Sequence, residues 1–151
     1  MHLTIASEYA LRGLAFLATC PPGAVVALAD IAEAQDLPST FLAKIFQKLH
    51  RHGLIAAQRG RGRGYQLARS PASITIRQIL EIVEGARLQQ RCLLWHGDCR
   101  DENPCPLHHR LKHLAPEIEW ILDRVTLAEY VDELGDLARH APVFTGSVSS
   151  L

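Results

Sequence analysis

Three cysteines cluster in one short stretch of the sequence, with the spacing Cys92-x6-Cys99-x5-Cys105. Thiolates are soft ligands that suit zinc, copper(I) and iron–sulfur clusters. Structural zinc sites more often contain two cysteines separated by two residues, and the sequence has no such pair. The wider spacings fit a loop wrapped around an object larger than one ion. We therefore predict an iron–sulfur cluster, 2Fe–2S or 4Fe–4S, with structural zinc or a thiol redox switch as the alternative.

Three cysteines leave one position at such a cluster for a ligand of another kind. His108 follows Cys105 by three residues, at the start of a predicted helix, and can reach the same site. Glu8 lies far away in the sequence but can arrive from the N-terminal helix of the same subunit or of a partner. Each also has an ordinary explanation, since His108 fits a solvated surface and Glu8 a first-turn acid that stabilises a helix dipole. Both stay open as the fourth ligand.

The elements that accompany this cysteine loop include a helix-turn-helix pattern. Residues 28–34 have a short helical pattern, which residues 36–39 (Asp-Leu-Pro-Ser) break. Ser39 or Thr40 is placed to cap a second helix, and Gly53 would end it. The second helix carries an apolar stripe at the helical period, formed by Phe41, Leu42, Ile45, Phe46 and Leu49. Its opposite face is polar and cationic, as in a helix that enters the major groove of DNA.

A β-hairpin is predicted directly after the second helix. Residues 54–58 and 65–67 are strand-like, and the tip between them reads Arg59-Gly60-Arg61-Gly62-Arg63-Gly64. Glycines permit close approach to a surface, and arginines contact phosphates or the minor groove. The predicted DNA contacts on the helix and on this wing are Ser39, Thr40, Lys44, Gln47, Lys48, Arg51, Arg59, Arg61, Arg63 and Tyr65.

Charge is distributed unevenly along the chain, although 16 basic and 16 acidic residues give a net charge of zero. Residues 37–80 contain lysines and arginines but no Asp or Glu. A cationic block of this kind indicates an anionic partner. A solvated face on a small helical domain is the alternative. The helix-turn-helix, the hairpin and the acid-free span together favour double-stranded DNA.

The N-terminal part supplies two further elements. Residues 2–19 are predicted to form the first helix, with Thr4 as its cap and Glu8 in its first turn, where a carboxylate suits the helix dipole. Residues 25–28 are predicted to form a short strand that leads into the helix-turn-helix.

The C-terminal half alternates helical patterns with an irregular segment. Residues 74–83 predict an amphipathic helix that closes near Gly85, and the pattern fails over residues 86–106, a length of loop that is usually functional. Beyond it, Pro116 is predicted to kink or restart a long helix, and Thr126 with Glu129 forms a capping box that opens a last helix. A heptad-like seam of apolar residues predicts pairing between subunits, and packing of this helix on the chain's own core is the alternative. The seam consists of Leu107, Leu111, Leu114, Ile118, Ile121 and Val125.

These patterns predict a mainly α-helical protein with a small β-hairpin wing, in which a winged helix-turn-helix is joined to a long C-terminal dimerisation helix. No run of apolar residues is long enough to cross a bilayer, so we expect a cytoplasmic protein that does not bind membranes. No nucleophile–base pair is evident, and we expect neither enzymatic activity nor a small-molecule substrate. The predicted divisions are a DNA-binding domain (1–85), a cluster-binding loop (86–106), dimerisation helices (107–141) and a flexible tail (142–151).

The chain resembles the IscR/NsrR-type family of bacterial winged-helix iron–sulfur regulators over nearly its whole length. The resemblance rests on the opening MHLTIASEYALRGL, the segment ALADIAEAQDLPSTFLAKIFQKLHRHGLI, the wing RGRGRGYQLAR and the triple-cysteine loop before a long helix. It implies homodimers that bind palindromic promoter DNA with an affinity set by cluster state. The implied cluster ligands are Cys92, Cys99 and Cys105.

Members of that family differ in the residue that completes the cluster site. In some it is a histidine three residues after the last cysteine, which matches His108, and in others an acidic residue near the start of the first helix, which matches Glu8. This chain carries both residues. It differs from the commonest IscR pattern in one extra residue between the first two cysteines of the loop, Cys92 and Cys99, and in Ala43, where an acidic residue can stand in the recognition helix. We predict a repressor that responds to redox state, nitric oxide or iron supply.

Overall fold

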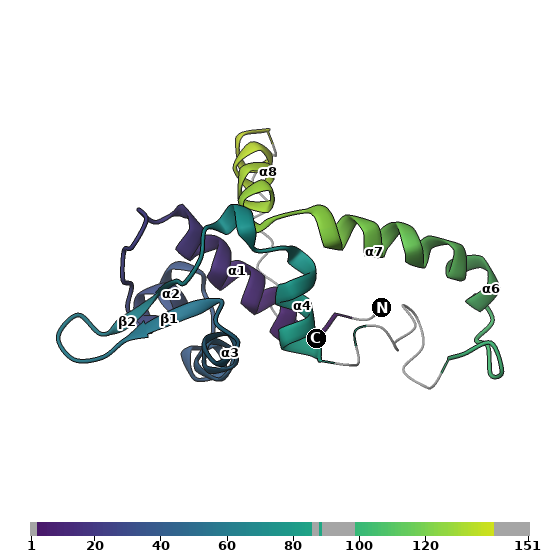
Figure 1. The fold of residues 1–151 in the computed structure, drawn as a ribbon, viewed down its shortest axis with the longest axis horizontal. Coiled ribbons are helices and arrows are strands. Elements are labelled where there is room, and N and C mark those ends of the chain that lie inside the picture. Colours follow the sequence, from purple (N-terminus) through teal and green to yellow (C-terminus); the bar gives the residue numbers. More distant parts are fainter. Residues whose placement is uncertain (1–2, 86–87, 89–98, 141–151) are drawn as a thin grey trace.

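The computed structural model describes residues 3–85, 88 and 99–140. Figure 1 shows an N-terminal body, an arm that leaves it, and a last helix that packs back on the body. The body contains α1 (Ile5–Thr19), α2 (Leu28–Ala34), α3 (Ser39–Arg51), β1 (Ile55–Gln58), β2 (Gly64–Leu67), the 3-10 turn η1 (Pro71–Ser73) and α4 (Ile76–Glu84). The arm contains α6 (His108–Leu111), the 3-10 turn η2 (Lys112–Leu114) and α7 (Ala115–Arg124), and the last helix is α8 (Leu127–His140). The predicted fold class is confirmed.

The core of the body lies where α1, α3 and α4 meet. The predicted stripe of α3 supplies Leu42, Phe46 and Leu49, each fully buried. Gly13 on α1 lets the two helices approach closely, because a Cβ atom there would lie 2.8 Å from the ring of Phe46. Leu127 from α8 is also fully buried, so the C-terminal part of the chain completes the core of the N-terminal part.

The wing is an antiparallel hairpin in which Ile55 pairs with Leu67 and Gln58 with Gly64. Its second strand also pairs with the chain before α2, since Val26 and Tyr65 exchange two backbone hydrogen bonds of 2.9 and 2.8 Å. A side chain at position 64 would clash with that neighbour, because a Cβ atom there would overlap the carbonyl oxygen of Val26. The base of the wing is therefore fixed to the helix-turn-helix.

Two predicted details of the helix-turn-helix and of the segment before it were wrong. Residues 25–28 do not form a strand, because only Val26 pairs with the hairpin and α2 begins at Leu28. Neither Ser39 nor Thr40 caps α3, since Pro38 occupies the N-cap position and no side chain caps the helix. Gly53 ends α3 as predicted, with a φ of 72°.

The first helix begins at Ile5, three residues later than predicted, with Thr4 at the N-cap position. The hydroxyl of Thr4 makes no capping bond within its own helix. Instead, the carboxylate of Glu84 at the end of α4 accepts from the Thr4 backbone NH at 2.8 Å and from its hydroxyl at 2.6 Å. The hydroxyl of Ser7, which is fully buried, donates to the same oxygen at 2.7 Å. The end of α4 therefore caps the start of α1.

The predicted seam helix is divided into α6, η2 and α7, and Pro116 lies in the first turn of α7, as the sequence indicated. The predicted capping box of α8 is confirmed, because the Glu129 carboxylate accepts from the Thr126 backbone NH at 2.8 Å and Glu129 NH donates to the Thr126 hydroxyl at 3.2 Å. The arm is tied to the body by Arg77 of α4, which forms an ion pair with Asp123. Within the described ranges, no helix has the length and apolar character needed to cross a membrane.

Candidate functional site

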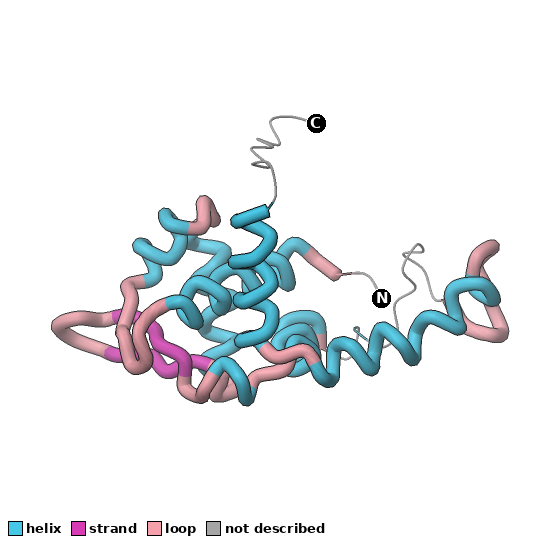
Figure 2. The backbone as a smooth tube through the Cα atoms, turned by 90° about the horizontal axis from the view of Figure 1, so that it is seen from above, coloured by secondary structure: helices cyan, strands magenta, loops and turns pink. Residues whose placement is uncertain are grey.

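The wing and the end of α6 lie at opposite ends of the molecule in both views (Figures 1 and 2). The chain therefore carries two separate candidate sites. One is the polar surface of α3 and the wing, and the other is the cysteine segment next to α6.

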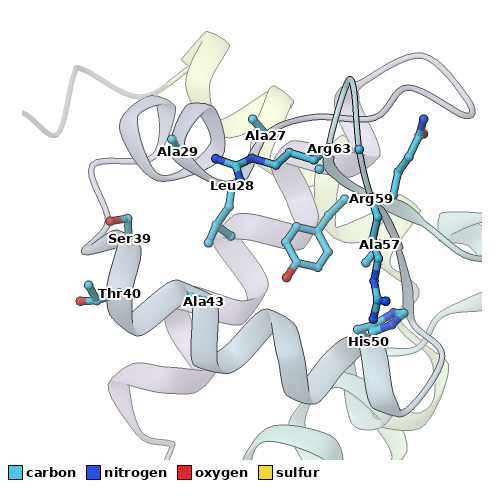
Figure 3. Close-up of a pocket in the computed structure, with 14 residues that line it drawn as sticks. Ala27, Leu28, Ala29, Ser39, Thr40, Ala43, His50, Ala57, Arg59 and Arg63 are labelled. Carbon is cyan, nitrogen blue, oxygen red and sulfur yellow. The ribbon is translucent and has the colours of Figure 1, made fainter.

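A groove of about 900 Å³ lies between the start of α2, α3 and the hairpin. Figure 3 shows Ser39 and Thr40 on the first turn of α3, on the side of the groove opposite the hairpin. Arg63 extends from the hairpin toward the start of α2, and Arg59 extends toward His50 near the end of α3. Within the described part of the chain, no Asp or Glu lines this groove. Its cationic and hydroxyl groups suit a phosphate backbone.

The predicted DNA contacts fall into three groups. Five of them line the groove: Ser39, Thr40, Arg59, Arg63 and Tyr65. Four others are exposed on α3 or at the hairpin tip without lining it: Lys44, Gln47, Arg51 and Arg61. Lys48 is different, because it is half-buried and its ammonium donates to the carbonyl oxygen of Val83 at 2.8 Å. The structure therefore brings five of the ten to one groove, leaves four exposed on α3 or the hairpin tip, and uses Lys48 to join α3 to α4.

Two polar side chains that line the groove, those of Gln58 and His50, were not predicted from the sequence. Gln58 precedes the wing arginines, and it was interpreted only as the end of a strand. His50 lies near the end of α3, where its Nδ1 is 3.0 Å from the carbonyl oxygen of Ile55. Its position one residue before Arg51, on a helix already interpreted as cationic, was the available signal. Tyr65 forms part of the floor, with its ring edge-on to Phe46 at a centroid distance of 5.2 Å.

The second site gathers Cys99, Cys105 and His108. The Sγ of Cys99 lies 3.1 Å from Nδ1 of His108 and accepts from the backbone NH of Cys105 at 3.4 Å. The backbone NH of His108 donates to the carbonyl oxygen of Cys105 at 3.0 Å. The segment before α6 thus turns so that a thiol and an imidazole nitrogen face each other. Cys92, the first predicted ligand, lies outside the described residues.

An acidic residue that the sequence analysis did not single out contacts this histidine. Oδ1 of Asp101 is 2.9 Å from Nε2 of His108, and the ammonium of Lys112 donates to both Asp101 oxygens at 2.7 and 2.6 Å. Hydrogen bonds from Lys112 and His108 lower the pKa of Asp101 to about 2. The carboxylate therefore stays ionised next to the imidazole. The spacing of residues in an irregular loop gave no signal for this contact.

Glu8, the other candidate for the fourth ligand, lies on α1 in the body of the molecule. Its carboxylate is 60% exposed and pairs with Arg12 on the next turn at 3.4 Å. α6 lies at the far end of the arm (Figure 1). The structure of one chain thus brings His108, and not Glu8, to Cys99.

The donor set next to α6 fits an iron–sulfur cluster chemically. Two thiols and an imidazole are ligands that such clusters accept, and Cys99 with His108 already meet at 3.1 Å. Over residues 3–85, 88 and 99–140, no three His, Cys, Asp or Glu side chains form a ready metal-binding group. The described residues therefore supply part of a ligand set, which Cys92 would extend.

Comparison with known proteins places the chain beside bacterial regulators. Residues 3–133 match the Rrf2 family, described as iron-dependent transcriptional regulators. The HTH-type transcriptional regulator IscR of Yersinia pestis is 32% identical over 132 residues, which cover 87% of this chain and 80% of that protein.

Solved structures share the same fold. The structure of CymR, the global cysteine regulator of B. subtilis, superposes with a TM-score of 0.71 at 22% identity, over 88% of this chain and 98% of that one. T. potens IscR superposes with a TM-score of 0.70 at 25% identity, over 95% of each chain. The likeness to CymR shows the fold alone, because the two sequences have diverged so far.

Proposed function

Since the chain belongs to the Rrf2 family of transcriptional regulators, we propose that it is a homodimeric repressor whose operator affinity depends on an iron–sulfur cluster. The chain is a DNA-binding regulator of the helix-turn-helix class and not an enzyme. The dimer, the contact residues, the cluster and its effect on DNA make up the proposal. The observation that carries the sensing part is the 3.1 Å approach of Cys99 Sγ and His108 Nδ1.

DNA would lie across α3 and the wing. Gln47 on the exposed face of α3 would reach base edges in the major groove. Lys44 on the same helix would contact a phosphate. The wing arginines would hold phosphates or enter the adjacent minor groove. The groove between them is acid-free and is walled in part by alanines, so a sugar–phosphate strand can approach the backbone closely.

Dimerisation would use the arm. None of the α7 side chains is buried in the single chain. Leu114, Trp120 and Ile121 expose 46%, 59% and 49% of their surfaces. An apolar helix face of this kind marks an interaction surface, and a palindromic operator requires two heads related by a two-fold axis. We expect Ile121→Glu to give a monomer by light scattering, while Glu119→Gln remains dimeric. A dimeric Ile121→Glu protein would remove this part of the proposal.

The cluster would be held by Cys92, Cys99 and Cys105, with His108 as the fourth ligand in preference to Glu8. When bound, an iron–sulfur cluster supplies iron that reacts with oxidants and nitric oxide. The protein supplies a connection to DNA through the last turn of α4, which directly precedes the segment that contains Cys92. Val83 in this turn accepts from Lys48 of the recognition helix at 2.8 Å, and Glu84 caps α1. A change in the cysteine segment would reach α3 by this route.

An anaerobic absorption spectrum, with iron and sulfide assayed on the same sample, tests the cluster. We expect coloured protein that contains both elements, and Cys99→Ala should lose the colour. Colourless wild-type protein that lacks iron after anaerobic reconstitution would refute the sensing part and leave DNA binding intact. A stoichiometric zinc content in that sample would identify the structural-zinc alternative.

A further inference from the structure

Asp101, His108 and Cys99 form a continuous chain of polar contacts. The carboxylate of Asp101 is 2.9 Å from Nε2 of His108, and Nδ1 on the opposite side of the ring is 3.1 Å from Cys99 Sγ. The imidazole is only 15% exposed, whereas Asp101 and Lys112 are 57% and 54% exposed. The histidine is thus held between a charged group on its solvent side and a sulfur atom on its inner side.

The chemistry of the partner on Nε2 indicates which ring nitrogen of the neutral imidazole carries the hydrogen. An ionised carboxylate only accepts hydrogen bonds, so Nε2 of His108 must carry the hydrogen that Asp101 binds. In the neutral imidazole, the lone pair then lies on Nδ1, the nitrogen that faces Cys99. In metal-ligating histidines, the N–H of the second ring nitrogen commonly donates a hydrogen bond to a carboxylate, which fixes the tautomer and the orientation of the ring. The Asp101–His108 pair has this arrangement.

We propose that Asp101 is a positioning residue, anchored by Lys112, that fixes His108 with its hydrogen on Nε2 and presents Nδ1 as the ligating atom. The ligand role of Nδ1 rests on the proposed cluster, whereas the tautomer does not. Lys112 contributes because its ammonium donates to both Asp101 oxygens, which restrains the carboxylate beside Nε2 of His108. Nδ1, and not Nε2, would then contact the iron.

The tautomer is tested in the full-length chain freed of metal. We expect the ¹⁵N NMR spectrum at about pH 8, where an ordinary imidazole is neutral, to place the His108 hydrogen on Nε2. Asp101→Ala should give a mixture of the two tautomers, and Lys112→Met should shift the population in the same direction. Glu102→Ala is the matched control, because it removes an equal charge from the exposed neighbouring residue. A hydrogen on Nδ1 in the wild type would overturn the inference.

The ligand role is tested by the rate at which a chelator removes iron from anaerobically purified holoprotein. Loss of such an outer carboxylate weakens metal binding by about 10–100-fold, so iron should leave Asp101→Ala faster by roughly that factor. Glu102→Ala should resemble the wild type. In a His108→Ala background, Asp101→Ala should change the rate by less than about twofold, because a residue that acts through His108 has no effect without it.

The two proposals fail in different ways. Wild-type protein without iron and sulfide would refute the proposed cluster and the ligand role together, and the NMR measurement would still decide the tautomer. If the Asp101→Ala and Glu102→Ala holoproteins lose iron at the same rate, the positioning role of Asp101 is overturned. The proposed cluster is unaffected by that result. Pulsed electron paramagnetic resonance with histidine labelled at Nδ1 should detect that nitrogen coupled to the reduced cluster.

Discussion

Lys48 provides a direct test of how the recognition helix is used. It belongs to the cationic face of α3, yet its ammonium donates to the Val83 carbonyl oxygen at 2.8 Å and the residue is half-buried. Lys44, one turn earlier, is exposed. We therefore expect Lys48→Ala to lower stability through the loss of an α3–α4 contact, and Lys44→Ala to weaken DNA binding through the loss of a phosphate contact.

The two effects have different magnitudes in different assays. A hydrogen bond from a charged donor contributes about 1.5–3 kcal/mol, and partial exposure reduces it here to about 1–2 kcal/mol. In a chain of this size, each kcal/mol lowers the melting temperature by about 2–4 °C, so Lys48→Ala should melt roughly 2–8 °C lower. Each phosphate contact contributes about 0.9 to the slope of log affinity against log salt. Fluorescence anisotropy across a salt series should show a slope reduced by about 0.9 for Lys44→Ala and an unchanged slope for Lys48→Ala.

The opposite pattern would refute this reasoning. If Lys48→Ala lowered the salt slope by about 0.9 and left the melting temperature unchanged, Lys48 would contact DNA and not support the helix. Lys48→Met separates charge from packing, since it keeps the length of the side chain. We expect it to melt below the wild type and to keep the wild-type salt slope.

Two further predictions concern the ends of helices. Glu84→Ala should lower the free energy of unfolding by about 2–4 kcal/mol, measured by denaturant titration, because it removes the acceptor of the buried Ser7 hydroxyl; an unchanged midpoint would contradict this. Hydrogen bonds from Thr126 lower the pKa of Glu129 below its ordinary value of 4.5. The contribution of Glu129 to the free energy of unfolding is therefore complete above about pH 4.5 and is lost as the pH falls through the lowered pKa. The difference in stability between the wild type and Glu129→Gln should therefore shrink from pH 7 toward acid, and a constant difference would exclude this cause.

Local patterns predicted the elements whose causes are local. The stripe of Leu42, Phe46 and Leu49 determined α3, and Gly53 ended it because the left-handed conformation suits glycine. The capping box of α8 needs residues only three apart. The cap of α1 was not predictable in this way, because its acceptor Glu84 lies 80 residues from Thr4. The same holds for Lys48 and Val83, which only tertiary packing brings together.

The candidate sites were predictable to different extents. Residue type and helical period predicted which polar side chains of α3 and the wing are candidates for contacting DNA, and five of them line one groove. The contact of Lys48 with the Val83 carbonyl oxygen was not predictable, because it depends on a tertiary neighbour. The cysteine segment revealed its ligand types but not their geometry. Asp101 was not identifiable as the partner of His108, because an irregular loop has no period that specifies side-chain directions. The contacts that join Asp101, His108 and Cys99 became visible only in the structure.

The most direct test of cluster-dependent regulation is equilibrium binding of two forms of the same preparation to one DNA duplex. The duplex is selected by the protein from random sequences, and the forms are the anaerobic iron-loaded protein and the same protein after chelation, at equal salt concentration. Allosteric coupling is typically about 5–150-fold in affinity, and we predict a difference in that range. Equal affinities, with iron and sulfide verified in the loaded form, would contradict the proposal that the cysteine site controls DNA binding.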